Sequence, residues 1–470
     1  MPALTLAALG LYLAAVLAIG FAWRRRAGRD EASYFVADRS LNTFWGFLGL
    51  ASLTTGGSTT IALAALVYTH GISGLWLDLA GALGLLALGL FFARRVRREG
   101  AVTLPEIIGR HYGASARRVA ALLVLVSEIV WFALLTEATQ IVLTAAFGLA
   151  PTRAIVLSTA VFVAYTSLGG QYAVVRTDLL QYGLMVAGIP GVGLYCALSA
   201  AKGLGGLPPA AWSFPTSATF GAGDVLAMLV LIGLPHMVGS DVYLKLLSCR
   251  DEDTARRSAL YAAGSKVLFG LSVAAIALCA RKALPPVEAS LALPAAVLGF
   301  APPALAAFVL VALVATMQTS ADIVLLSASA VTARDLAPPL LGGRTLPIAA
   351  SRALPLLYGA LGLVTALVLD RDVLKTLRLG YSIFAAGLIL PTLAAFLPKR
   401  WTVPTRGAIV AMIAGGGTAA AGRFFPSLSG GRDPVLVGTA VNAVVLVAAF
   451  LAGRVGAAGA AGAGGGTAEG

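Results

Sequence analysis

Leu53-Thr-Thr-Gly-Gly-Ser58 is the stretch of sequence that decides the fold. It lies at the centre of an apolar run over residues 43–69, which is long enough to cross a bilayer, because a spanning helix takes about 20 apolar residues. Adjacent glycines cost about 1 kcal/mol each relative to alanine, and the neighbouring hydroxyls compete for backbone hydrogen bonds. The helix is therefore predicted to open here and to leave carbonyls free, which lipid tolerates only beside protein or a wet cavity. Close helix packing through small residues is the alternative interpretation.

Composition indicates an all-α polytopic membrane protein. The 470 residues are 59% hydrophobic and 12% charged, with a mean hydropathy of +0.89, which is more apolar material than a soluble core can hide. About 13 transmembrane helices are predicted from the apolar runs, over residues 4–23, 43–69, 73–95, 117–148, 152–170, 175–200, 222–247, 257–281, 302–333, 346–370, 373–398, 404–424 and 433–454.

Basic residues set the predicted orientation. The first run has no basic residues before it and four arginines after it, so it is an anchor with its N-terminus outside, not a signal peptide. Thirteen spans then put the C-terminus in the cytoplasm of a multi-pass cell (plasma) membrane protein. The basic loops that fall on the cytoplasmic side in this scheme contain Arg94, Arg95, Arg97, Arg98, Arg110, Arg117 and Arg118, then Arg250, Arg256 and Arg257, then Lys399, Arg400 and Arg406.

The net charge of +13 does not indicate a nucleic-acid partner, because the arginines flank spans and report topology and contact with anionic lipid. Cys196, Cys249 and Cys279 lack metal-site spacing and fall in or beside different spans, so they are interpreted as packing residues. No organic cofactor is indicated. The Gly/Ala-rich tail, residues 456–470, is expected to be disordered, with no soluble domain after the last span.

A second interrupted span lies five helices after the first. It carries Gly233-Leu-Pro-His236 and then Gly239-Ser-Asp241. Paired Gly/Pro-interrupted spans at corresponding positions of two halves are typical of inverted-repeat transporters with a site at mid-membrane depth, although proline also kinks helices for purely structural reasons. The predicted organisation is a first helix and basic loop (1–42), two five-helix repeats (43–200 and 201–400), two further helices (401–455) and the tail.

The ninth predicted span carries polar groups on one helical face. Thr316, Thr319 and Ser320 follow the i, i+3, i+4 pattern, with Asp322 at the edge of that face. Hydroxyls beside freed carbonyls offer the oxygen ligands that a small hard cation needs, and a mid-membrane aspartate is expected to face the bundle interior or water. Hydrogen bonding between helices is the alternative role of the hydroxyls, and the acid in the same cluster favours the ion site.

Several segments together resemble the sodium:solute symporter family. They run in the family's order between about residues 34 and 400. These segments are Tyr34-Phe-Val-Ala-Asp-Arg-Ser-Leu41, Thr103-Leu-Pro-Glu-Ile107, Tyr165-Thr-Ser-Leu-Gly-Gly-Gln-Tyr-Ala-Val-Val-Arg-Thr-Asp-Leu-Leu-Gln181, the segment from Asp241 to Arg257, and Thr319-Ser-Ala-Asp322. Departures from the family pattern are Gln171 after the glycine pair, Leu244-Lys245 in place of Gln-Arg, and Thr54 where some members carry Asp or Asn.

The resemblance implies a LeuT-type fold of two inverted five-helix repeats and a secondary active transporter. Inward sodium flow would drive uptake of a small organic solute by alternating access. The family's shared sodium site, carried over by motif, falls on the carbonyls of Ser52, Thr55 and Thr316 and on the hydroxyls of Thr319 and Ser320. A register shifted by one residue would use Ala315, Gln318 and Thr319 instead, but the Asp322-to-Asp335 spacing favours the first register.

Two further hypotheses concern the solute and the path of the ion. The solute is expected near Gly57, Ser58, His236 and Asp322, where unpaired backbone groups and polar side chains converge. Bulk at Gly57 should block binding, whereas Gly84→Ala in the next span is expected to be mild.

Asp178 is placed at the cytoplasmic end of its span, beside Arg176. It is interpreted either as a station for sodium leaving inward, because a carboxylate at a vestibule mouth concentrates cations, or as a helix cap or surface pair with that arginine.

Three other classes remain open from the sequence. A proton-coupled transporter of the same fold would carry its proton on Asp322, Glu137 or His236. A sensor built on the fold should continue into an output module, and no such module follows the last span. An enzyme would need a catalytic constellation, and no zinc-protease, nucleophile-elbow or P-loop motif occurs. The chain is therefore expected not to be an enzyme.

Overall fold

The computed structural model describes residues 2–369, 372–398 and 401–463, and this part of the chain consists of helices joined by turns and loops, without a β-strand. Short 3-10 and π-helical segments join several of the helices. The α-helices are α1 (Pro2–Ala27), α2 (Glu31–Val36), α3 (Thr43–Thr55), α4 (Ser58–His70), α5 (Trp76–Ala87), α6 (Ala93–Glu99), α7 (Leu104–Phe147), α8 (Pro151–Val186), α9 (Leu194–Ala200), α10 (Ala222–Met228), α11 (Leu234–Val238), α12 (Ser240–Leu247), α13 (Glu252–Ala283), α14 (Ala292–Phe300), α15 (Pro303–Val331), α16 (Ala337–Leu340), α17 (Ile348–Val368), α18 (Val373–Phe384), α19 (Leu390–Ala395), α20 (Thr405–Phe424) and α21 (Pro434–Ala463).

The predicted break in the second span is present. Helix α3 begins after Asn42, whose side chain accepts a hydrogen bond from the Trp45 amide at 3.2 Å, and it ends at Thr55. Gly56 is extended and Gly57 has φ +66°, so the backbone leaves the helix for two residues before α4 starts at Ser58. The interpretation of this stretch as an opened helix is therefore confirmed.

The seventh predicted span is interrupted as well. A π-helical segment, Leu229–Gly233, leads into the short helix α11, and Gly239 then adopts ψ 140° before α12 begins at Ser240. The interruption exposes the start of α12 inside the bundle, so each of the two proposed repeats contains one broken helix.

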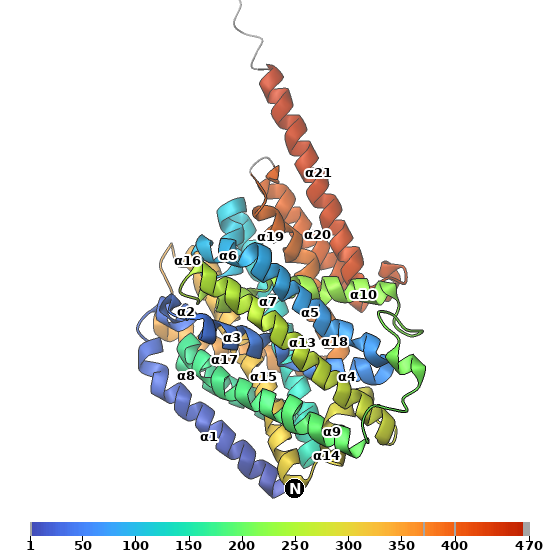
Figure 1. Ribbon diagram of the computed structural model, residues 1–470. Coiled ribbons are helices and arrows are strands. Elements are labelled where there is room, and N and C mark those ends of the chain that lie inside the picture. Colours follow the sequence, from blue (N-terminus) through green and yellow to red (C-terminus); the bar gives the residue numbers. More distant parts are fainter. Residues whose placement is uncertain (1, 370–371, 399–400, 464–470) are drawn as a thin grey trace, which may run out of the picture.

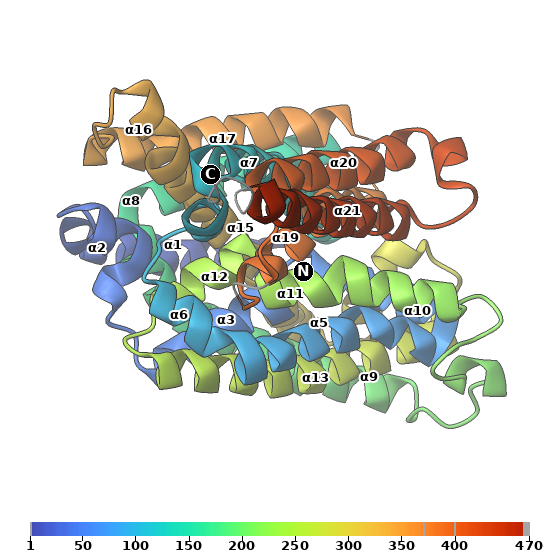
Figure 2. The ribbon, with the colours of Figure 1, turned by 90° about the horizontal axis from the view of Figure 1, so that it is seen from above.

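Helix α15 is the centre of the bundle. Every residue of its most apolar eighteen-residue window is buried, whereas only 22% of the corresponding windows of α1 and α21 is buried. It packs against α1, α3, α7, α8 and α17. Figure 1 shows α1 at the edge of the molecule, and Figure 2 shows α5 and α13 on one side of α15 with α7 and α17 on the other. A helix with no lipid-facing side is well suited to hold polar groups.

Ten helical stretches of the described chain are long and apolar enough to cross a membrane. The predicted count of thirteen is not reached by this measure, and it stays a prediction. One reason is that the break divides the second predicted span into α3 and α4, each of 13 residues. The repeat boundaries also stay predictions.

The expected disorder of residues 456–470 stays a prediction, and the described helix extends into the first part of this stretch. Helix α21 continues to Ala463, since alanine is the best helix former and dominates this stretch. Residues 464–470 lie outside the described part of the chain.

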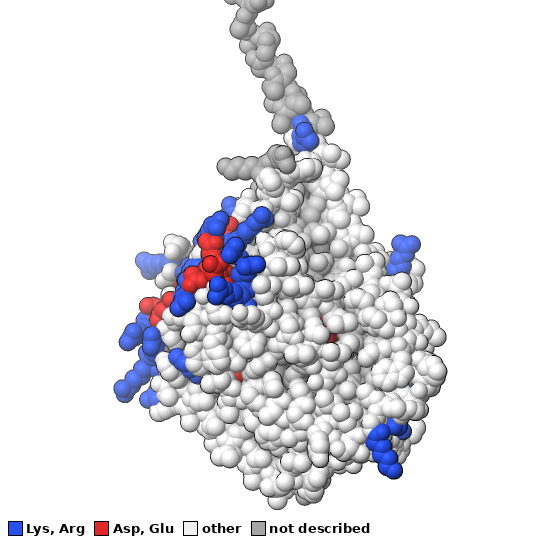
Figure 3. Space-filling model, in the orientation of Figure 1, with Lys and Arg blue, Asp and Glu red and all other residues white. Residues whose placement is uncertain are grey.

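Charged side chains gather at one end of the helices. Figure 3 shows mixed lysine, arginine and acidic residues over the region of α2, α6 and α16, and a largely uncharged surface over the bundle below it. Arg94 and Arg98 of α6 pair there with Asp253 and Glu252 at 2.5 and 2.8 Å. This clustering agrees with the predicted basic loops, of which Lys399 and Arg400 lie outside the described residues. The side of the membrane on which each terminus lies stays a prediction.

Candidate functional site

The break between α3 and α4 is held against the middle of α15. The Gly57 amide donates a hydrogen bond to the Thr316 carbonyl at 2.6 Å. A Cβ atom on Gly57 would lie 2.7 Å from the Ser320 hydroxyl oxygen, and its positive φ already favours glycine. Glycine is therefore required here both by the backbone conformation and by the close approach of α15.

Two of the predicted carbonyl ligands point to the same place. A Cβ atom on Gly56 would lie 2.6 Å from the Ser52 carbonyl oxygen and 2.9 Å from the Thr316 carbonyl oxygen. The third predicted carbonyl, that of Thr55, accepts a hydrogen bond from the Thr60 hydroxyl at 3.2 Å, so it is already engaged with α4. A carbonyl oxygen has a second lone pair, so this bond leaves a position for an ion.

The two predicted hydroxyl ligands are buried on α15 and face different neighbours. Thr319 donates a hydrogen bond to the Asp178 carboxylate at 2.8 Å, and Ser320 donates one to the Leu53 carbonyl at 3.3 Å. In the alternative register the ligand would be Gln318, but its side chain accepts a hydrogen bond from the Tyr12 hydroxyl of α1 at 2.7 Å. Because Gln318 faces α1 and not the break, this geometry favours the first register.

Asp178 is not at a cytoplasmic surface. It is fully buried, and it accepts hydrogen bonds from Ser52 at 3.0 Å and Thr319 at 2.8 Å on one oxygen. Its other oxygen forms an ion pair with Lys245 of α12 at 2.5 Å. Residues two apart on a helix differ by about 200° in direction, so when Asp178 faces α3 and α15 its neighbour Arg176 must face outward.

The expected pairing of Asp178 with Arg176 is therefore wrong. The Arg176 guanidinium lies over the rings of Trp23 and Trp45, 4.8 and 4.1 Å from their centroids. Asp178 instead joins the predicted ion ligands directly, and Lys245, noted in the sequence only as a departure, supplies its counter-charge.

Asp322 does not line the solute cavity, which corrects that prediction. Its carboxylate accepts a hydrogen bond from Thr166 of α8 at 2.9 Å. The physical reason is helical register, since Ser320 and Val324 face the cavity and the residue midway between them points to the opposite side of α15. Asp322 therefore lies between α15 and α8, behind the cavity wall.

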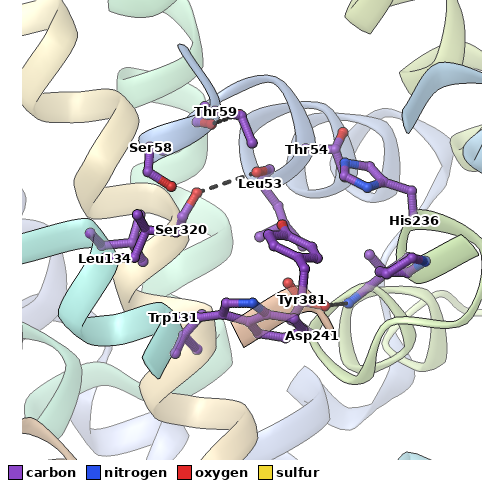
Figure 4. A pocket seen from close by; sticks show the side chains of 16 residues that line it. Leu53, Thr54, Ser58, Thr59, Trp131, Leu134, His236, Asp241, Ser320 and Tyr381 are labelled. Carbon is purple, nitrogen blue, oxygen red and sulfur yellow. Dashed lines mark hydrogen bonds between the residues drawn. The ribbon is translucent and has the colours of Figure 1, made fainter. Parts of the chain in front are cut away.

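A cavity opens beside the break. Figure 4 shows that α3, the start of α4, α7, α11 and α15 contribute to its wall. Gly57, Ser58 and His236 line it, and Ser320 lies on the wall shared with the predicted ion ligands. The predicted ion ligands and the cavity are therefore adjacent and share one hydroxyl.

Three residues of the cavity wall were not predicted from the sequence to lie there. Trp131 of α7, Tyr381 of α18 and Asp241 at the start of α12 lie together in Figure 4. Asp241 could have been found, because it follows the interrupted segment at Gly239. Nothing in the sequence around the two aromatic residues distinguishes them from core residues.

A second buried ion pair holds the C-terminal end of α3. Lys266 of α13 pairs with Asp78 of α5 at 2.7 Å and also donates a hydrogen bond to the Thr54 carbonyl. One carbonyl freed by the break is thus satisfied by the protein itself. Arg378 of α18 pairs with Asp433 at 3.5 Å and does not line the cavity.

A model of the sodium:solute symporter family matches residues 34–207. The resemblance to this family is confirmed. The match includes α3, α4 and α8, and therefore Ser52, Thr55 and Asp178, whereas α15 with its hydroxyl ligands lies beyond it.

Characterised proteins of similar sequence are transporters. The chain is 28% identical to High-affinity choline transporter 1 of Caenorhabditis elegans over 163 residues, which is 35% of this chain and 28% of that protein. It is 28% identical to the osmoregulated proline transporter OpuE of Bacillus subtilis over 194 residues, which is 38% of each. The matched segments therefore span only 28% and 38% of the length of these two relatives.

Solved structures share the fold over nearly the whole chain. A structure described as the substrate-bound outward-open state of a Na+-coupled sialic acid symporter superposes with a TM-score of 0.79 at 18% identity, and the match covers 96% of this chain and 98% of that one. The predicted LeuT-type fold is thus confirmed. Because the sequence identity is low, this structural similarity supports the fold and no shared function.

Proposed function

We propose that this chain is a sodium-coupled symporter that takes up a small organic solute by alternating access. The observation that carries the proposal is the convergence of the opened helix with α15. Carbonyls of Ser52 and Thr316 flank one point at Gly56, and the hydroxyls of Thr319 and Ser320 lie on the adjoining face of α15. Oxygen ligands without sulfur or imidazole suit a hard cation such as sodium.

Asp178 adds a negative charge to the proposed ion site. Its carboxylate is hydrogen-bonded to both Ser52 and Thr319, so an ion held by those residues would lie close to it. The proposed role changes from a station on the cytoplasmic path to an electrostatic partner of the ion. Lys245 neutralises this carboxylate when no ion is bound, because a buried unpaired charge is costly.

Ser320 provides the coupling between ion and solute. Its hydroxyl is a proposed sodium ligand, and it also lines the cavity against Gly57. An ion that fixes Ser320 and the break therefore shapes the cavity wall, and a solute in the cavity stabilises the same arrangement. Such coupling is reciprocal, so solute should raise sodium affinity by the factor by which sodium raises solute affinity.

The remaining parts of the proposal follow from this mechanism. Sodium is cargo and coupling ion, no organic cofactor takes part, and no nucleic acid is a partner. The chain works in the lipid bilayer of the cell membrane, N-terminus outside and C-terminus in the cytoplasm, and it catalyses no chemical reaction. Its relatives named above are transporters, which supports this assignment.

A proton-coupled transporter is the second candidate. One observation favours it, since Oδ2 of buried Asp322 has no hydrogen-bond partner within the described residues. A protonated carboxyl would fit such a place better than a charged one. His236, by contrast, uses Nδ1 on the Ile232 carbonyl at 2.8 Å, and Glu137 is fully buried in α7.

Uptake into proteoliposomes separates the two candidates. A sodium gradient at equal pH on both sides should drive accumulation of a solute identified by thermal-shift screening, and a pH gradient without sodium should not. The reverse result would replace the sodium proposal with the proton one.

A further inference from the structure

The cavity carries an uncompensated negative charge. Among the described residues that line it, Asp241 is the only carboxylate, and none is a lysine or arginine. One Asp241 oxygen accepts a hydrogen bond from the Val242 amide at 2.8 Å, which holds the side chain at the start of α12. Among the residues that the structure describes, Asp241 takes part in no ion pair, and it remains partly exposed to the cavity.

The nearest charged groups are already committed elsewhere. Lys245, one turn further along α12, is paired with Asp178 at 2.5 Å. Glu128 of α7 accepts a hydrogen bond from Ser327 at 2.6 Å and is a carboxyl group, so it supplies no positive charge to this region. In the described part of the chain, no lysine or arginine is paired with Asp241.

Two aromatic rings lie beside this carboxylate. The centroids of Trp131 and Tyr381 are 4.8 Å apart, with the ring planes tilted by 46°, and both rings line the cavity. Figure 4 shows them grouped with Asp241. Aromatic faces attract cations through their quadrupole, most strongly where water is excluded. A carboxylate with two aromatic neighbours is a site for an organic ammonium group.

A donor for the rest of the solute lies at the same place. The Trp131 side chain is only 5% exposed, and its indole N–H has no hydrogen-bond partner in the described chain. A buried donor without a partner costs free energy, which a hydroxyl or carbonyl oxygen of a bound solute would recover.

We infer that the solute is a small organic cation, with its ammonium group held by Asp241, Trp131 and Tyr381. This inference rests on the proposed symport function and names its substrate class. Ser320, a proposed ion ligand, lines the cavity from α15, whereas Asp241 enters from α12, so sodium and the ammonium group would occupy different walls. An anionic solute would instead meet Asp241 without a lysine or arginine in the cavity wall to attract it.

The first test uses wild-type protein and two probes of one shape. Choline carries a quaternary ammonium group, and dimethylbutanol is its uncharged carbon isostere. Thermal unfolding of the purified full chain in sodium chloride is expected to show protection by choline at a concentration at least about tenfold lower than that required for dimethylbutanol. Equal protection by the isostere, or protection by sodium with none by choline or tetramethylammonium, would overturn the inference.

Variants locate the charge recognition. Asp241→Asn should abolish the preference for choline, and Trp131→Leu should weaken it by about tenfold, while Trp131→Phe keeps a ring and most of the preference. Asp253→Asn, which removes an acid with a 62% exposed side chain, is the matched control and should change nothing. A preference that survives Asp241→Asn would contradict the assignment of that carboxylate.

The same measurement keeps the two proposals apart. Sodium alone should stabilise the wild type and Asp241→Asn equally, because Asp241 is not among the proposed ion ligands. Loss of the choline preference with sodium stabilisation intact concerns the solute only, whereas absence of any sodium effect in the wild type would refute sodium coupling itself.

Discussion

Replacing Lys245 by methionine tests the link between the buried ion pair and the ion site. The pair with Asp178 is 2.5 Å long, and the two side chains are 1% and 0% exposed. Removing one member of such a pair costs about 3–5 kcal/mol, because the other charge stays buried without compensation. Asp178 keeps its hydrogen bonds from Ser52 and Thr319, so we expect the lower end, about 3 kcal/mol, or roughly a hundredfold in the folding equilibrium.

Sodium should reverse much of this loss. An ion bound by Ser52 and Thr319 would lie beside the buried, uncompensated carboxylate of Asp178 and would take the place of the missing ammonium group. Thermal unfolding of Lys245→Met in sodium chloride and in potassium chloride of equal ionic strength should therefore differ more than that of the wild type. The double variant with Asp178→Asn should regain stability and lose the enhanced sodium effect.

The exposed pair of Arg94 and Asp253 provides the control. Its side chains are 52% and 62% exposed, so Arg94→Met should cost only about 0–1 kcal/mol and show no dependence on the identity of the cation. If sodium stabilises Lys245→Met no more than it stabilises the wild type, the ion does not lie beside Asp178, and the site must be placed elsewhere.

Three further outcomes are expected. Thr319→Ala and Ser320→Ala should each weaken sodium activation of uptake by about tenfold to a hundredfold, since each removes a hydroxyl ligand, and unchanged sodium dependence in both would reject the ligand assignment. Gly57→Leu should abolish solute binding because a side chain there meets Ser320. Gly183→Ala, with open space around its Cβ position, should bind solute normally. Equal damage to folding by both substitutions would favour a packing role for Gly57. Asp322→Asn should leave the sodium dependence of uptake intact. If uptake by the wild type did not depend on sodium, and Asp322→Asn removed its pH dependence, the result would support proton coupling.

The broken helix was predictable because its cause is local. Two adjacent glycines in an apolar run weaken that helix wherever it packs, and the structure opens it at Gly56 and Gly57. The hydroxyl face of α15 was predictable for a similar reason, since helical periodicity alone places Thr316, Thr319 and Ser320 on one side.

The partners of the charged residues were not predictable, because they come from distant segments. Asp178 and Lys245 are 67 residues apart, and no spacing rule connects them. Gly84 shows the same limit, since its replacement by alanine, expected to be mild, would place a Cβ against the Gly233 carbonyl. Whether a glycine is replaceable depends on the helix that crosses it, and a single span does not contain that information.

The two buried lysines have a consequence for the response to membrane voltage. Lys245 and Lys266 each cancel one aspartate, so the two pairs carry no net charge with them when the protein changes conformation. When these parts of the protein move, the charge that crosses the membrane is then the charge of the bound ion and solute. Each elementary charge gains about 2.3 kcal/mol per 100 mV. Sodium together with an organic cation would gain about twice that, about 4.6 kcal/mol per 100 mV. Current recorded on solid-supported membranes would measure this charge movement directly, and two charges per transported solute are expected.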